Sequence, residues 1–211
     1  MRSEGVTRRP YGWAALLWVA GCAAPDAPAR TGPSRQLTIS DHVHGGGTRG
    51  FWFLPPMVPR PAHSGDFLPD LAPLVRLDEL RPDGTTRRTL ATFTRTSGPG
   101  RERLRVHLAG QPADPDDDDG DADPEGYFYA RWSPRDEHLS LSAVYRVRVL
   151  VPTRGGGLQE LGFADIDVVR NGREARVADR AEVVPLIRGE RLRIKFRVDR
   201  PAVDADADGV Y

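Results

Sequence analysis

Cationic and apolar residues alternate without a fault through the stretch Arg191-Leu192-Arg193-Ile194-Lys195-Phe196-Arg197-Val198. Successive side chains of a β-strand point to opposite faces, so a period of two places the apolar residues of this stretch on one face and its cations on the other. We therefore predict a strand whose apolar face packs in a core and whose cationic face contacts water. A helix would instead require a period of roughly 3.6 residues.

The same alternation recurs along the chain, and short clusters of glycine and proline separate the alternating stretches. The further predicted strands are Phe51–Leu54, Thr86–Thr96, Arg103–Leu108, Tyr127–Trp132, Tyr145–Val149, Ile166–Val169 and Val183–Ile187. Gly155–Gly157 predicts the turn of a hairpin, and no stretch shows a helical apolar stripe longer than one or two turns. Many short, half-buried strands separated by turns are typical of antiparallel folds. We therefore predict an all-β protein, an antiparallel β-sandwich in preference to a barrel.

The composition of the 211-residue chain excludes several classes of function. Its 30 basic and 30 acidic residues give a formal net charge of +0, whereas a general nucleic-acid binder carries a basic excess, so we expect no nucleic-acid partner. The single cysteine, Cys22, rules out disulfides within the chain and zinc sites built from several thiolates. The single lysine, Lys195, precedes Phe196 and therefore does not belong to a P-loop.

The N-terminal residues predict an export signal. Met1–Arg9 carries three arginines, and the apolar, uncharged segment Tyr11–Gly21 follows it. A basic start followed by an apolar segment too short to span a bilayer is typical of a secretory signal peptide. We place this signal peptide at residues 1–21.

The segment Val19-Ala20-Gly21-Cys22 resembles the lipobox of bacterial lipoproteins, in which a small residue precedes the cysteine that is lipidated and becomes the mature N-terminus. The resemblance implies that Cys22 carries the lipid and anchors the protein to a membrane. Ala23 stands where aspartate commonly retains such proteins at the inner membrane, which implies an outer-membrane-anchored lipoprotein of the bacterial cell envelope. The alternatives are an ordinary signal peptide with a chance cysteine and an uncleaved apolar N-terminus.

Composition divides the rest of the chain into further segments. Residues 22–35, which include the lipidated cysteine, are rich in proline and small residues and predict a flexible, disordered tether. The predicted β-sandwich domain occupies residues 36–200. Within it, the acidic segment 111–126 predicts a disordered loop, and residues 201–211 predict an acidic tail.

Leu139–Val149 carries a resemblance to a known fold. It resembles the corner and following strand of fibronectin type III and related immunoglobulin-like modules, in which a leucine precedes a tyrosine by six positions. The resemblance implies that Leu139 packs in the core and that the Tyr145 hydroxyl bonds to upstream backbone. Further segments resemble a recurrent domain of secreted bacterial proteins, for which no activity is implied. They are Gly50–Pro56, Ala91–Pro99, Tyr145–Val151, Leu161–Val169 and Pro185–Val198.

The acidic tail contains a candidate metal site. Asp204, Asp206 and Asp208 stand at alternate positions before Gly209, as at the start of a calcium loop, where oxygen ligands alternate and a glycine provides a sharp turn. These three aspartates are the candidate calcium ligands, and calcium is the only cofactor that the sequence suggests. A frayed acidic tail is the alternative.

Two patterns contain histidine. His44-Gly45-Gly46-Gly47 is similar to the oxyanion loop of some lipases and esterases. No serine in the chain has the Gly-X-Ser-X-Gly setting that those enzymes need, so we expect a flexible glycine turn. His42 and His44 would share a strand face, and a metal there would need a third ligand, such as His63 or His107.

These features favour a function without catalysis. No local motif supplies a nucleophile, an acid pair or a metal triad, so we expect a membrane-anchored, secreted module for binding, adhesion or envelope structure, whose protein or glycan ligand is not identified by the sequence. The alternatives are an envelope hydrolase with a distributed site and a calcium-stabilised extracellular module. The arginines of the strand faces would either attract acidic polysaccharide or phosphorylated glycans, or pair with acids across strands.

Overall fold

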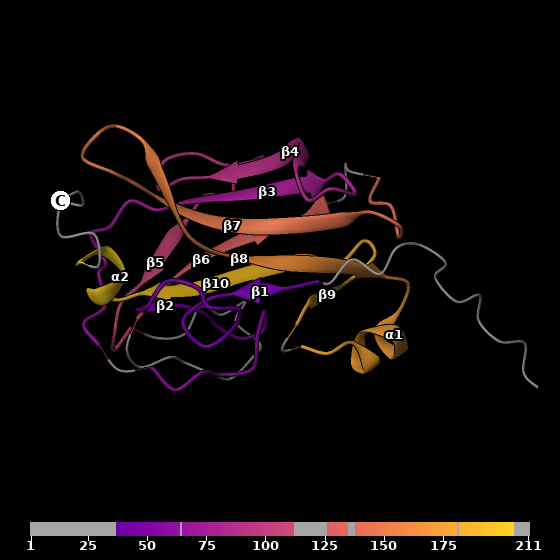
Figure 1. The fold of residues 1–211 in the computed structure, drawn as a ribbon, viewed down its shortest axis with the longest axis horizontal. Helices are drawn as coiled ribbons and strands as arrows, with labels where there is room; N and C mark the ends of the chain where they lie inside the picture. The colour runs from indigo at the N-terminus through magenta and orange to yellow at the C-terminus, as the bar shows by residue number, and fades with distance from the viewer. Residues whose placement is uncertain (1–36, 64, 112–125, 135–137, 181, 205–211) are drawn as a thin grey trace, which may run out of the picture. The chain divides into compact units, whose positions relative to one another are not determined.

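Two β-sheets pack against each other in the part of the chain that the structure describes (Figure 1). This computed structural model describes residues 37–63, 65–111, 126–134, 138–180 and 182–204. All of them belong to one compact unit, Arg35–Tyr211. The predicted all-β sandwich is confirmed.

The larger sheet has six strands. Their bounds are β1 (Ile39–Ser40), β3 (Leu74–Leu80), β4 (Thr86–Phe93), β7 (Val144–Pro152), β8 (Leu158–Val169) and β9 (Val184–Ile187). The order is β1-β8-β7-β3-β4, and β9 pairs with a further part of β8. Neighbouring strands of this sheet are antiparallel, as predicted, except for β8 and β9, which run parallel.

The smaller sheet has four strands in the order β2-β10-β6-β5, and all of its pairs are antiparallel. The bounds are β2 (Phe51–Phe53), β5 (Arg105–His107), β6 (Tyr127–Trp132) and β10 (Leu192–Val198). Two short helices complete the described part of the chain, α1 (Gly172–Val177) and α2 (Pro201–Asp204).

Apolar side chains from both sheets meet in one core. On β10, Ile194 and Phe196 are fully buried, as the alternation predicts, and Phe196 stacks on Phe128 of β6 with 5.4 Å between the ring centroids. The larger sheet contributes Val75, Leu77, Val147, Val149 and Ile166. Each strand therefore turns alternate side chains inward, which is the physical basis of the sequence period.

The sequence predicts the bounds of β6 and β10 closely but does not predict β1 or β3. β3 reads Leu-Val-Arg-Leu-Asp-Glu-Leu, and its alternation stops where Asp78 and Glu79 follow each other. Both acids are buried, because arginines on neighbouring strands form ion pairs with them. Two adjacent acidic residues interrupt the period of two in this strand, so the pattern that identifies the other strands is absent from β3.

The hairpin that joins β7 to β8 turns at Gly155–Gly157, as predicted. Thr153 donates its backbone N–H to the Gly157 carbonyl at 3.0 Å, and Gly156 donates to the Thr153 carbonyl at 3.0 Å. Gly156 has a φ of 78°, which lies in the region where only glycine is unstrained.

The prediction that the cations of β10 contact water is wrong for two of them. Lys195 is 6% exposed and lies over the Tyr127 ring, and Arg197 is only 1% exposed. The segment between β2 and β3 lies against this outer face, since Arg197 donates from Nη2 to the Gly65 carbonyl at 2.9 Å and sits over the Phe67 ring. The cationic face of β10 is thus covered in part by the segment between β2 and β3, which is distant in sequence.

Arg197 joins parts of the chain that are far apart in sequence. Its Nε donates to Asp199 Oδ1 at 2.7 Å, and its Nη1 donates to the Gly126 carbonyl at 3.0 Å. Asp199 is fully buried. The guanidinium therefore ties the end of β10 to Gly65 and to the residue that precedes β6.

The packed domain continues past residue 200, where the sequence predicts an acidic tail. α2 places Ala202 and Val203 in the core, at 1% and 5% exposure. Gly50 lies so close to α2 that an added Cβ would stand 2.7 Å from the Ala202 nitrogen. The first residues after 200 are therefore part of the sandwich.

The contact implied by the Leu139–Val149 resemblance is present. The backbone N–H of Ser140 donates to the Tyr145 hydroxyl at 2.8 Å, and Leu139 is 3% exposed in the core. The hydroxyl holds the loop that leads into β7 against the strand itself.

Replacing Tyr145 by phenylalanine should lower the free energy of unfolding by about 1 kcal/mol, because the Ser140 N–H loses its acceptor at the edge of the core. Urea denaturation followed by tryptophan fluorescence measures this change as a lower midpoint at an unchanged slope. Val177→Ala, at a side chain that is 82% exposed, is the control and should leave the midpoint unchanged. Equal midpoints for the two variants would contradict a structural role for the hydroxyl.

Replacing Arg197 by methionine should cost about 3–5 kcal/mol, because Asp199 remains buried and charged without its guanidinium partner. The measurement is the unfolding free energy in urea. A double variant, Arg197→Met with Asp199→Asn, removes the buried charge and should recover part of the loss. If the single variant costs less than about 1 kcal/mol, the typical value of an exposed pair, the buried ion pair does not carry this part of the fold.

Candidate functional site

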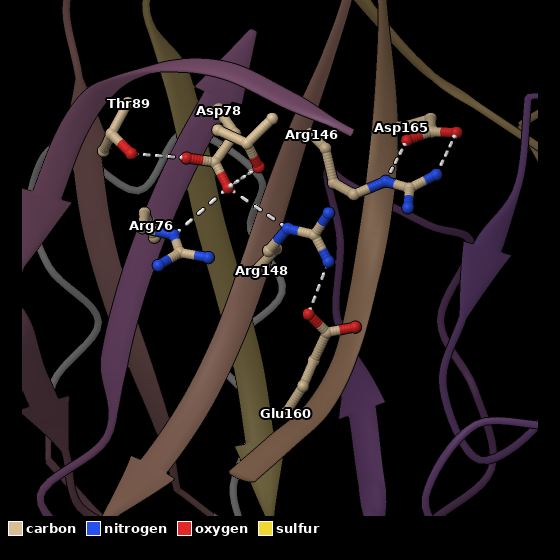
Figure 2. A network of polar contacts seen from close by, with 8 residues as sticks. Arg76, Asp78, Thr89, Arg146, Arg148, Glu160 and Asp165 are labelled. Atoms are coloured by element: carbon tan, nitrogen blue, oxygen red, sulfur yellow. Dashed lines mark hydrogen bonds and ion pairs between the residues drawn. The ribbon is translucent and has the colours of Figure 1, made fainter. Parts of the chain in front are cut away.

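The outer face of the larger sheet carries a network of arginines and acids that spans β3, β7 and β8 (Figure 2). On β7, Tyr145, Val147 and Val149 turn into the core, so the alternate residues Arg146 and Arg148 turn outward. Arg76 and Arg148 stand directly opposite each other on β3 and β7. This face gathers side-chain contacts from three strands and is the candidate site.

Asp78 lies at the centre of the network and is fully buried. Its Oδ2 accepts from Arg76 Nε and from Arg148 Nε, each at 3.1 Å, and its Oδ1 accepts from the Thr89 hydroxyl at 2.7 Å. The Thr86 hydroxyl donates to Oδ2 at 3.3 Å. One carboxylate thus orients two guanidinium groups and also accepts hydrogen bonds from two threonine hydroxyls of β4.

Arg146 forms a second centre beside Arg148. Its Nε and Nη2 donate to the two oxygens of Asp165 at 2.6 and 2.9 Å, and Asp165 is 1% exposed. The guanidinium lies over the Phe163 ring, 3.7 Å from the ring centroid, which is the geometry of a cation–π contact. Bidentate pairing and ring contact together fix the orientation of this arginine.

Charges on this face are balanced. Arg148 donates from Nη1 to Glu160 Oε2 at 2.6 Å, and with this pair the network holds three arginines and three acids. Of the two roles predicted for the strand arginines, pairing with acids across strands is the one observed here. Two of these acids, Asp78 and Asp165, are buried, whereas the Glu160 side chain is 33% exposed.

The sequence reasoning did not single out Asp78 or Asp165. The available signal is weak but identifiable, because each aspartate interrupts an apolar strand sequence, as in Leu77-Asp78 and Asp165-Ile166. An aspartate within an apolar strand sequence indicates a carboxylate that is paired with an arginine, when another predicted strand of the same chain carries arginines.

Glu79 forms a separate acidic centre at the edge next to β4. It is 6% exposed, and it accepts from Arg88 Nε at 2.8 Å and from Arg87 Nη1 at 2.8 Å. The hydrogen bond from Arg88, with the charges of both arginines, lowers the pKa of Glu79 below its ordinary value of 4.5 and outweighs burial, which raises it.

The glycine turn expected at His44–Gly47 is an ordered loop built around Asp41. The fully buried Asp41 carboxylate accepts from the backbone N–H of Val43 at 3.0 Å and from the backbone and ring nitrogens of His44, both at 2.8 Å. A Cβ on Gly47 would stand 2.5 Å from the Asp41 nitrogen. The glycine permits this close approach, and the expected turn is present, with positive φ at Gly45 and Gly46.

The structure does not bring the candidate histidine ligands together. His42 Nδ1 accepts from the Gly50 N–H at 2.9 Å and its ring stacks on Trp52, whereas His44 turns to Asp41. His107 stacks on the ring of Tyr127. Among the residues described by the structure, no group of three or more histidine, cysteine or acidic side chains is placed to hold a metal ion.

Several predicted site residues lie outside the described part of the chain. These are Cys22, Asp206, Asp208 and segment 112–125 of the acidic loop. Asp204 ends α2, and its side chain is also outside the described atoms. In the described ranges, no helix has the length and apolar character needed to cross a membrane.

Comparisons with models of known protein families, with curated proteins and with solved structures find no match for this chain.

The ionised form of Glu79 should stabilise the fold in a defined pH window. Because the pKa is lower in the folded than in the unfolded chain, this stabilisation is present above about pH 4.5 and is lost as the pH falls through the folded pKa. Glu79→Gln should therefore lower stability by about 1 kcal/mol at pH 7 and flatten its decline in acid. Urea denaturation between pH 7 and pH 3 measures both effects. An unchanged pH dependence, equal to that of the exposed control Glu182→Gln, would contradict the role of Glu79.

Proposed function

We propose that this chain is a lipid-anchored, non-enzymatic binding module of the bacterial cell envelope, held at the outer membrane by an acylated Cys22. The observation that carries the proposal is the place of that cysteine, since the only cysteine of the chain directly follows an apolar segment and three small or β-branched residues, Val19-Ala20-Gly21. Burial of the hydrocarbon of several acyl chains, at about 0.8 kcal/mol per CH₂, makes such an anchor firm.

The position of the folded domain supports this arrangement. The first strand, β1, begins at Ile39, shortly after the proline-rich segment 23–35. An extended proline-rich segment of this length would reach about 40 Å, at about 3.1 Å per residue. The sandwich would then stand clear of the membrane surface and present its outer faces.

The strand arrangement supports a relation to immunoglobulin-like modules, which commonly act in recognition. The tyrosine corner lies at the start of β7, and β7 pairs with β3 and β8 as strand F pairs with C and G in that fold. β10 departs from the scheme, because it lies between β2 and β6. We infer an immunoglobulin-like sandwich with an additional C-terminal strand in its smaller sheet.

No described cluster favours the hydrolase alternative. The buried acids Asp78 and Asp165 hold arginines, and Asp41 holds a turn. Each carboxylate therefore has a structural partner that explains its burial, and recognition by an outer face is the function that these contacts support best.

Growth of cells expressing the protein with a labelled fatty acid should label the wild type and not Cys22→Ala. The label should follow the outer-membrane fraction, and Ala23→Asp should move the labelled protein to the inner membrane. Urea denaturation of each variant is the control and should give the wild-type midpoint, because both substitutions precede the unit Arg35–Tyr211. Equal labelling of Cys22→Ala would refute the anchor.

A further inference from the structure

We propose that Arg131 and Arg193, on the outer face of the smaller sheet, bind a side-chain carboxylate of an acidic segment of a partner protein. The residues on either side of each arginine in β6 and β10 are buried in the core, so both arginines turn outward. The inference rests on the proposed function in one respect, because it names a partner class for that binding module.

The two arginines stand directly opposite each other on neighbouring antiparallel strands, Arg131 on β6 and Arg193 on β10. Both side chains are half-buried, so water reaches part of each. Like charges at directly opposite positions of an antiparallel pair repel each other. An anion placed between two such guanidinium groups attracts both of them, and the pair is therefore suited to an anionic ligand.

The larger sheet shows which anion such a pair accepts. Arg76 and Arg148 are likewise directly opposite each other, on β3 and β7. The Asp78 carboxylate bridges them, because its Oδ2 accepts from each Nε at 3.1 Å (Figure 2). The same arrangement of two arginines on the smaller sheet therefore fits one carboxylate.

The two pairs differ in the residues that their own strands place beside them. Asp78 follows Arg76 by two positions on β3, so the larger sheet supplies its own acid. On the smaller sheet, the next outward positions beside the arginine pair hold Tyr129 and Lys195. The outward positions of β5, β6 and β10, all within the described part of the chain, hold arginine, lysine, tyrosine and histidine, and none holds an acid. The strands of this face therefore do not supply the carboxylate.

Neighbouring side chains favour a protein as the carrier of that carboxylate. Tyr129 is half-buried in the next row, and the Arg105 guanidinium lies 6.0 Å from the centroid of its ring. Tyrosine and arginine are among the residues most enriched at the energetic centres of protein interfaces. The Arg105 side chain is 41% exposed, and its ion pair with the 38% exposed Glu102 is long, at 3.9 Å. Arg105 can therefore bind a further carboxylate.

The spacing of the cations fits an extended acidic segment. Alternate residues of an antiparallel strand are about 6.8 Å apart. This distance separates the row of Arg131 and Arg193 from the next row, in which Arg105 stands opposite Tyr129. An extended segment with acids at alternate positions has the same repeat, so two of its carboxylates can meet the two rows at once.

The test is a titration of the full-length protein with a short labelled peptide of alternating aspartate and alanine, followed by fluorescence anisotropy. The peptide should bind with saturation and more weakly at high salt, whereas the neutral peptide of alternating asparagine and alanine should not bind. Arg131→Gln and Arg193→Gln should each weaken binding about tenfold, the effect of one charge-assisted hydrogen bond of about 1.4 kcal/mol. Arg176→Gln is the matched control, because it removes the same charge from an exposed position of α1 and should leave the affinity unchanged.

Unchanged affinity in both Arg131→Gln and Arg193→Gln, or equal binding of the neutral peptide, would overturn the proposal. Tighter binding of an oligonucleotide or an oligogalacturonate of equal charge would overturn a protein as the partner. The chain's own acids near Arg131 in sequence are Asp136, Glu137 and those of segment 111–126. If the peptide binds only after these acids are replaced by amides, the chain itself supplies the carboxylate and the proposal is wrong. A failed lipid label at Cys22 would overturn the anchor while leaving this titration intact.

Discussion

Burial of aspartate carboxylates controls how this sandwich is arranged. A carboxylate removed from water costs several kcal/mol unless donors inside the protein meet it. Asp78, Asp165 and Asp199 are each at most 1% exposed, and each is met by an arginine. The pairs are Asp78 with Arg148, Asp165 with Arg146, and Asp199 with Arg197. Two of these pairs link adjacent strands of the larger sheet, and the third secures the segments that cover the smaller sheet.

This pairing makes the register of the larger sheet specific. Because the side-chain period of a strand is two, a slip by one residue on β3 would turn Asp78 into the apolar core and Leu77 out of it. The slip would also separate Asp78 from Arg148 on β7. Asp78 interrupts the alternation of β3, and its ion pair with Arg148 also helps to hold β3 in its place between β4 and β7.

The pairing also limits how the outer face can act. A face on which arginines and acids are paired gives little long-range attraction for a polyanion, in contrast to a surface with a basic excess.

The sequence by itself determined the parts of this protein that depend on neighbouring residues. The alternation of Arg191–Val198, the glycine turn after β7 and the corner at Tyr145 were all predictable, because strand faces, tight turns and the corner hydrogen bond are local. The sequence also marked arginines on the outer faces, but not the acids that meet them. Only the tertiary structure decided that Arg197 is buried and that Asp78 is central to the network. Arg197 is covered by segments from distant parts of the chain, and Asp78 accepts from an arginine 70 residues away. Contacts between residues so far apart do not change the local alternation of the sequence.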